Sequence, residues 1–487
     1  MNEIFRSVQN YLLSAKDGMS DGMNLLTQLS RIFFIFLILI FTLQDYTYYS
    51  KKTPEGRERV AERQAVIMYL FSGLGFLLIF LNTGNLLALV FLAGVYIYYS
   101  AARNGYMAMY SKASMLLVNN MLMLLSIGFI IIARLSLEQA VKQFIIASAG
   151  TVLSFLIPVV VRKMKILPRL TWLYAALGII ALLGVLALAT VSGGAKLSIS
   201  VAGITIQFSE LVKITLVFFI ASMLARDTSF RSVVITTIVA AVHVGILVLS
   251  TDLGTAVVFF AAYIVMVFVA TRKAVYPLAG LLGGSAAAVA AYFLFGHVRQ
   301  RVIAWKDPLV VYDTSGYQIA QALFAIGAGG WLGTGLFYGR PETIPVASKD
   351  FIFAAICEEF GCLFAISLIL ICMNMFILIV NISMQIRNPF YKLVALGLGT
   401  EYAIQVFLTI GGVTKFIPMT GITLPLVSYG GSSVMSTIIV IANVQGLYIL
   451  REDEGEELER RKEEKIRRRP DRAGNWPGGP GNYEGER

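Results

Sequence analysis

The sequence has 487 residues, of which 57% are hydrophobic and only 14% are charged, and its mean hydropathy is +0.74. Soluble domains are close to half apolar and a quarter charged, so this composition excludes an ordinary soluble protein and predicts a membrane protein. The net charge of +11 does not indicate nucleic-acid binding, because the basic excess lies in short loops of residues 1–450, where orientation signals and anionic head groups or substrates account for it.

Thirteen apolar segments follow one another along the chain, each close to the length that crosses a bilayer as a helix. The predicted spans are 29–48, 65–81, 84–100, 114–133, 144–161, 170–191, 210–225, 232–250, 254–270, 275–295, 353–381, 393–413 and 433–450. The fold class is therefore an all-α polytopic membrane protein.

Basic residues alternate between the loops, which predicts an orientation. Cytoplasmic loops carry the excess of Lys and Arg, and seventeen such residues lie in the loops 49–64, 101–113, 162–169, 226–231, 271–274 and 382–392. We expect these loops and the charged tail in the cytoplasm. The N-terminus and the long loops are then outside the cell, at 192–209, 296–352 and 414–432.

The loop 296–352 is the longest and breaks the charge pattern. A loop of this length is usually functional or disordered, and aromatic residues within it predict packing. Its cations lie on the outer side, where the pattern disfavours them, so we expect an anionic ligand there. They are Arg299, Arg301, Lys306, Arg340 and Lys349.

Four polar stretches lie at membrane depth, where ionisable groups are costly and therefore indicate function. All four fall on the outer side in the predicted orientation, which indicates one site. They are 207–213, 251–255, 350–359 and the Gly/Pro-broken stretch 420–433.

Each stretch also has a structural interpretation. Glu210 and Lys213 are three residues apart and could simply pair with each other. Asp252 and Asp350 could be helix N-caps. Irregular backbone at 420–433 must be buried in protein or line a wet cavity.

Five motifs resemble those of the SEDS family (shape, elongation, division and sporulation). The stretch from Asp350 to Gly361 resembles the family's DFIFAxxxEELG, and Pro425 to Ser433 resembles its LPxxSYGGSS. The stretches 207–213, 252–255 and 316–327 resemble QPSExxK, PDLGT and GYQxxQxxxAIG. Lys196 stands where the family has Arg.

The resemblance covers about 114–450, which contains ten predicted spans, the number in the family fold. It implies a ten-helix core at 107–450, extra transmembrane helices at 1–106, and a charged tail at 451–487 that we predict to be disordered. We expect the extra helices to pack laterally on the core or to contact a partner. A chain that begins near Met107 should then retain some activity.

Membership of this family implies a peptidoglycan glycosyltransferase that joins lipid II units and releases undecaprenyl pyrophosphate. Its implied partners are a class B penicillin-binding protein and other membrane proteins of the division or elongation machinery. The leaving group is already a pyrophosphate, so the reaction needs one base and cations for the diphosphate. Asp350 matches the family position and is our candidate base, although a helix N-terminus would lower its pKa.

The cations that could hold the diphosphate are Lys196, Lys213, Arg299 and Arg301. The other candidate substrate-binding residues are Gln207, Glu210, Asp252, Gln318, Glu358 and Ser428. The sequence requires no cofactor and leaves a divalent metal ion open. Two alternatives of other classes are a flippase or transporter for lipid-linked precursors and a non-catalytic scaffold of the cell-wall machinery.

Overall fold

The computed structural model describes residues 20–188, 199–201 and 204–467. The elements before the longest loop are α2 (Ser20–Ser50), α3 (Pro54–Thr83), α4 (Leu87–Met109), α5 (Met115–Leu135), α6 (Leu137–Ser154), α7 (Ile157–Lys163), η1 (Leu167–Arg169), α8 (Thr171–Leu188), β1 (Ile199–Val201), β2 (Ile204–Ile206), α9 (Ser209–Leu224), α10 (Phe230–Leu249), α11 (Leu253–Thr271) and α12 (Val275–Leu294). They are followed by α13 (Gly296–Lys306), α14 (Tyr317–Gly329), η2 (Pro341–Thr343), α15 (Ile352–Gln385), α16 (Pro389–Val413) and α17 (Gly431–Arg467).

Each of the thirteen predicted spans coincides with a long helix, except that the fifth is divided between α6 and α7. The division falls just before Pro158, which has no amide hydrogen to continue a helix. Eleven helical segments of the described chain are long and apolar enough to cross a membrane. These eleven segments do not include α4, and they do not include α9, which is only 16 residues long. The prediction of an all-α polytopic membrane protein is confirmed.

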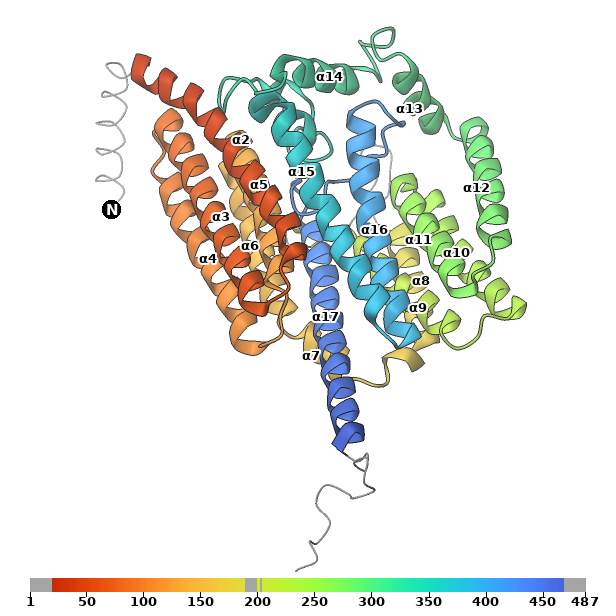
Figure 1. The fold of residues 1–487 in the computed structure, drawn as a ribbon. Coiled ribbons are helices and arrows are strands. Elements are labelled where there is room, and N and C mark those ends of the chain that lie inside the picture. Colours follow the sequence, from red (N-terminus) through yellow and green to blue (C-terminus); the bar gives the residue numbers. More distant parts are fainter. Residues whose placement is uncertain (1–19, 189–198, 202–203, 468–487) are drawn as a thin grey trace, which may run out of the picture.

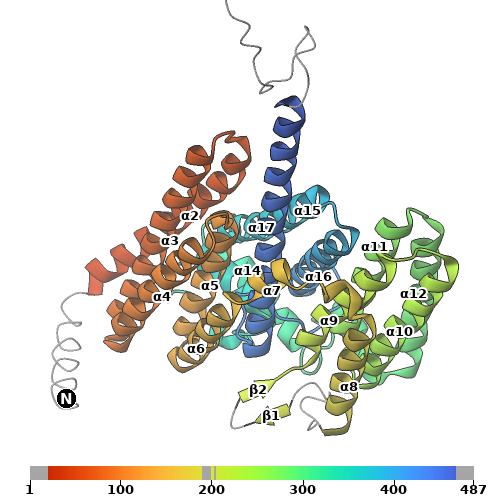
Figure 2. The same cartoon turned by 90° about the horizontal axis from the view of Figure 1, so that it is seen from below.

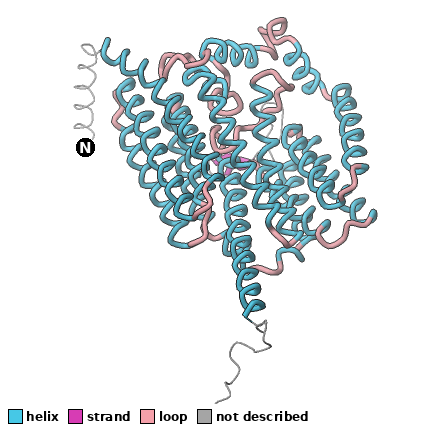
Figure 3. The backbone as a smooth tube through the Cα atoms, in the orientation of Figure 1, coloured by secondary structure: helices cyan, strands magenta, loops and turns pink. Residues whose placement is uncertain are grey.

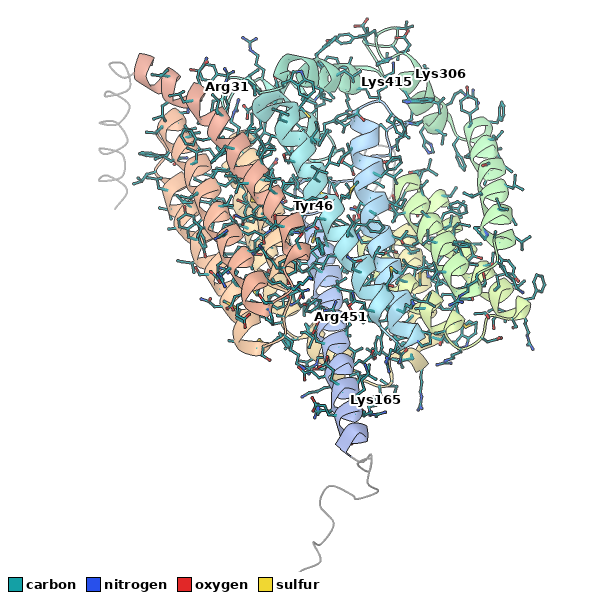
Figure 4. The ribbon with its side chains drawn as sticks, viewed as in Figure 1. Arg31, Tyr46, Lys165, Lys306, Lys415 and Arg451 are labelled. Atoms are coloured by element: carbon teal, nitrogen blue, oxygen red, sulfur yellow. The ribbon has the colours of Figure 1, made fainter. Side chains whose placement is uncertain are left out.

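The helices form two groups with α15, α16 and α17 between them. Viewed from below, α2 to α6 lie on one side and α8 to α12 on the other (Figure 2). The helices α13 and α14 lie at one end of the bundle, and α17 leaves at the opposite end (Figure 1). Lys306 and Lys415 lie at the first end and Lys165 and Arg451 at the second (Figure 4). We call these the loop end and the tail end.

The charged tail differs from its prediction, because α17 continues as a helix to Arg467. Residues 451–467 are therefore helical, whereas we predicted disorder from 451 onward. Asp453 anchors this extension through ion pairs with Lys112 at 2.8 Å and Arg162 at 2.7 Å. The abundant Glu and Arg residues also favour helix by intrinsic propensity.

α15 is broken at Gly361, where φ is 85° and ψ is 170°. The break frees backbone groups that the residues 330–335, which we call the wedge, satisfy from the side. The amides of Thr334 and Gly335 donate to the carbonyls of Glu358 and Glu359, both at 2.9 Å. In return, the amides of residues 362 and 363 donate to the carbonyls of 330 and 331. Irregular backbone is tolerated at this depth because the wedge pairs with it.

The extra N-terminal helices pack on the core, as predicted. On α2, the Phe34 ring lies 4.8 Å from that of Phe360, and on α3 the Phe71 ring stacks on Phe364 at 5.8 Å between centroids. The interface also contains Asp45, which is fully buried. Hydrophobic packing thus covers both halves of α15.

Candidate functional site

Residues 414–430 re-enter the bundle from the end of α16 without forming a helix (Figure 3). Leu424 to Ser428 are buried. α5 approaches this backbone closely, since a Cβ on Gly128 would lie 2.5 Å from the carbonyl oxygen of Val427. The irregular stretch is therefore buried in protein, which is one of the two predicted possibilities.

The re-entrant segment holds the turn that carries Asp350. The Ser428 hydroxyl donates to the carbonyl of Lys349 at 2.7 Å and accepts from the amide of Leu424 at 2.9 Å. The amide of Tyr429 donates to the carbonyl of Ser348 at 2.7 Å. Two bonds to the residues directly before Asp350 thus fix its backbone, and Ser428 acts here by positioning.

Asp350 does not cap α15, because the N-cap residue is Phe351. The carboxyl group instead faces Arg301 of α13 across Gly421. A Cβ on Gly421 would lie 3.8 Å from Asp350 Oδ2 and 3.7 Å from Arg301 Nη2. Arg301 also donates to the carbonyls of Met419 and Thr420, at 3.3 and 2.9 Å. The N-cap interpretation of Asp350 is therefore wrong.

Burial raises the pKa of Asp350, and the positive charges of Lys349 and Arg301 partly offset this effect. We expected a lower pKa from a helix N-terminus, and that direction is wrong because desolvation outweighs the nearby cations. Burial lowers the pKa of Arg301, while Asp350 and Asp252 act in the opposite direction. Arg301 thus lies in the field of both carboxylates.

Asp252 is the N-cap of α11, as its structural interpretation predicted, and accepts from the amide of Thr255 at 3.2 Å. It also accepts from the Ser209 hydroxyl at 3.0 Å and from the Gln207 amide group at 3.3 Å. The backbone amide of Gln207 donates to Ser432 at 2.9 Å. Asp252 therefore links α11 to α9 directly and, through Gln207, to the start of α17.

Glu210 and Lys213 form the ion pair that their spacing allowed, at 2.6 Å, and both are buried. Lys213 also donates to Gln405 at 2.9 Å. Glu401 lies beside them and is buried, and neither of its carboxylate oxygens has a hydrogen-bond partner among the residues that the structure describes. A cavity of about 10 Å³ between these residues has room for about one water molecule. These residues form a buried polar layer between α9, α16 and α17.

Three other predicted residues do not join this group. Arg299 is exposed, donates to the carbonyl of Phe293 and lies over Tyr292. Gln318 is exposed on α14. Glu358 accepts from the backbone amide of Arg340 at 2.9 Å and thus holds the loop. The remaining candidate, Lys196, lies outside the described residues.

Sequence reasoning missed three polar side chains near the site, which are Glu401, Gln405 and Arg134. Glu401, Gln405 and Thr409 follow one another every four residues on the apolar helix α16, so they lie on one face of it. This polar face could have identified Glu401 and Gln405 from the sequence. Arg134 pairs with Glu359 at 3.1 Å at the loop end. Arg134 lies in the last turn of α5, and nothing in the sequence around it indicated this ion pair.

Arg301 supplies a positive charge near Asp350 and Asp252. Within the described ranges, no group of three or more His, Cys, Asp and Glu side chains could hold a metal ion. We therefore derive no step through a metal.

Residues 107–448 match the sequence model of the FtsW/RodA/SpoVE family, described as cell cycle proteins. The chain belongs to this family. This match confirms the resemblance to the SEDS proteins and includes every residue of the Asp350 site. The three helices α2, α3 and most of α4 lie before the matched region.

Among the relatives is the peptidoglycan glycosyltransferase RodA of Mycobacterium tuberculosis H37Rv, 38% identical over 51% of this chain and 56% of that protein. The chain thus spans about half the length of the first curated relatives that it matches. A probable peptidoglycan glycosyltransferase FtsW of Saccharophagus degradans is 32% identical over 66% of this chain and 88% of that protein.

The fold is similar to that of a chain from a peptidoglycan synthase complex that coordinates polymerisation and crosslinking. The TM-score is 0.61, with 22% identity over 70% of this chain and 98% of that chain. This likeness shows that the two chains share a fold.

Proposed function

We propose that this chain polymerises lipid II into glycan strands on the outer face of the cytoplasmic membrane. The observation that carries the proposal is the Asp350 carboxyl group facing Arg301 across Gly421, between α13, α15 and the re-entrant segment. Family membership and relatives named as peptidoglycan glycosyltransferases support it.

In the proposed reaction, the 4-hydroxyl of an acceptor sugar attacks the anomeric carbon of a lipid-linked donor. A new C–O bond forms with inversion as the bond to the pyrophosphate breaks, and undecaprenyl pyrophosphate leaves with the bonding electrons. Asp350 accepts the hydroxyl proton, and its raised pKa makes it a stronger base than an exposed carboxylate. Arg301 stabilises the negative charge that develops on the leaving group.

The decisive experiment is polymerisation of purified lipid II by the purified full chain, with and without a class B penicillin-binding protein. We expect glycan polymer from the wild type and none from Asp350→Ala. Asp313→Asn is a matched control, because it removes an exposed carboxylate from the same outer loop. Lack of polymer under both conditions, combined with lipid II movement across vesicles, would favour the flippase alternative. Normal polymer from Asp350→Ala would remove Asp350 as the base.

We further propose that a class B penicillin-binding protein is the partner, supported by the fold similarity to a chain of a peptidoglycan synthase complex. Co-purification of the two full-length proteins tests this. The chain is also proposed to need no cofactor, so a metal chelator should leave the polymerisation rate unchanged. A rate that falls with the chelator and returns with a divalent ion would contradict this.

The proposed orientation places the loop end outside the cell. Single cysteines test this in a chain without Cys357, Cys362 and Cys372. Suitable positions are Ser315→Cys and Glu463→Cys, because Ser315 and Glu463 are both exposed and belong to segments at opposite ends of the bundle. An impermeant maleimide added to intact cells should label the first and not the second. The reverse pattern would place the Asp350 site in the cytoplasm and exclude the proposed function.

A further inference from the structure

The N-terminal helix α2 contacts the wedge, although it lies outside the matched family region. Arg31 on α2 donates to the carbonyl oxygen of Gly333 at 3.2 Å. One turn earlier, the Thr27 carbonyl oxygen lies 3.6 Å from the place of a Cβ on Gly335. Arg31 lies at the loop end of the bundle (Figure 4). One helix outside the core thus covers the apex of the wedge.

The wedge fits tightly into the break of α15. A Cβ on Gly333 would lie 2.3 Å from the carbonyl oxygen of Glu359, and one on Gly361 would lie 2.2 Å from the amide nitrogen of Gly333. Both glycines have positive φ, at 76° and 85°. No larger residue fits at either position without moving backbone, so the two chain segments must stay in register.

The wedge is also connected to the turn that carries Asp350. Beyond it, Glu359 accepts from the amide of Phe337 at 3.0 Å, and Glu358 accepts from the amide of Arg340 at 2.9 Å. The chain then reaches residues 348 and 349, which the re-entrant segment holds. Movement of the wedge would therefore move the loop that leads into Asp350.

A second contact fixes α2 lower down. Asp45 is fully buried and accepts from Gln64 of α3 at 2.6 Å, while Asn120 of α5 and Asn374 of α15 face the same carboxyl group. All three partners are fully buried. Polar groups among apolar helices are costly unless they meet, so this cluster specifies the register of α2 along α15.

We propose that α2 is a built-in positioning helix. The Asp45 cluster sets its register on α15, and Arg31 at the loop end then holds the wedge in the break of that helix. The wedge in turn keeps the start of α15, and hence Asp350, in place. The catalytic consequence rests on the proposed polymerase function, whereas the effect on the wedge does not. Arg31 and Asp45 are thus positioning residues that need not touch substrate.

Arg31→Gln in the full-length chain tests the proposal by amide hydrogen exchange. The amides of Thr334, Gly335, Cys362 and Leu363 close the break and report on the wedge. We expect them to exchange about tenfold faster, the scale of one lost hydrogen bond to a charged group. Phe33→Leu is the control, because Phe33 is exposed on the same turn of α2. It should leave these amides unchanged.

Polymerisation of lipid II supplies the second measurement. Arg31→Gln should lower kcat with little change in KM, at an unchanged temperature of unfolding. Arg31→Lys keeps a donor at the end of a different side chain and should produce a smaller change in the same direction. If the wedge amides of both variants exchange at the wild-type rate, the proposal is wrong whatever the activity. If the wild type makes no polymer, the proposed function fails and the exchange experiment still decides the role of α2.

Discussion

Burial and neighbouring cations act on the Asp350 carboxyl group in opposite directions. Desolvation raises its pKa, and Lys349 and Arg301 limit the rise, so the group can both ionise and accept a proton. The sequence singled out Asp350 and Arg301 as candidates, because a carboxylate at the entrance of a predicted span and cations in a predicted outer loop are visible in one chain. It could not predict that Asp350 points away from the helix start.

Asp350→Asn separates catalysis from stability. A base contributes about 10² to 10⁴ in rate, so we expect polymerisation to fall by at least about 100-fold. The pKa of Asp350 is raised in the folded state, so ionisation of this carboxyl group lowers the stability of the folded protein as the pH rises through that pKa. At neutral pH the variant should therefore unfold at the same or a higher temperature than the wild type. A lower unfolding temperature would show that the carboxylate is structural.

Arg301 should shift the pH dependence of the reaction. Removing its positive charge in Arg301→Gln raises the pKa of Asp350 further, so the loss of rate on the acidic side should begin at a higher pH. Arg301→Lys keeps the charge and should leave the acidic limb near its wild-type position, although the maximal rate falls. The pH profile of lipid II polymerisation measures this. An unshifted acidic limb in Arg301→Gln would mean that Asp350 is not the titrating base.

At the scale of elements, hydropathy predicted the helices and missed their interruptions. Twelve of the thirteen apolar segments each coincide with a single helix and the fifth is divided between α6 and α7, because a span of that length has few alternatives in lipid. The break at Gly361 was not predicted, since the apolar sequence continues on both sides of it. The break exists because residues 330–335, distant from it in the chain, supply the missing hydrogen bonds. Pairing between distant segments cannot be derived from local pattern.

Gly333→Ala tests how tightly the wedge is fitted. The new Cβ would meet backbone at 2.3 Å, and the φ of 76° is unfavourable for alanine. We expect a loss of about 1–3 kcal/mol in unfolding free energy. Gly327→Ala on α14 is the matched control, because nothing lies within 4 Å of its Cβ. It should be neutral or stabilise by up to about 1 kcal/mol. Equal unfolding temperatures for both variants would show that the wedge is loose.

At the scale of the whole molecule, the family region and the folded unit have different limits. The match begins at residue 107, yet α2 and α3 contribute Asp45 and Gln64 to a buried cluster with Asn120 and Asn374 of the core. The predicted spans 65–81 and 84–100 contain no Asp, Glu, Lys or Arg. The cluster was missed because Gln64 lies just before the second span and Asp45 near the end of the first. Only the packing of four helices brings them together.

This cluster changes the expectation for a chain that begins at Met107. Without residues 1–106, Asn120 and Asn374 would lose the Asp45 carboxyl group beside them and the helices that bury them, and polar groups exposed to lipid are costly. The wedge would also lose Arg31. We now expect a lower unfolding temperature and a large loss of polymerisation in the truncated chain.

Replacing the two uncovered amides separates these effects. Asn120→Leu and Asn374→Leu together, in the truncated chain, should restore much of the unfolding temperature, because the exposed surface becomes apolar. Polymerisation should stay low, because the wedge still lacks Arg31, and supplying residues 1–106 as a separate chain to the unsubstituted truncated chain should raise it again. Wild-type stability and rate in the truncated chain would instead mean that α2, α3 and α4 only pack on the side of a self-sufficient core.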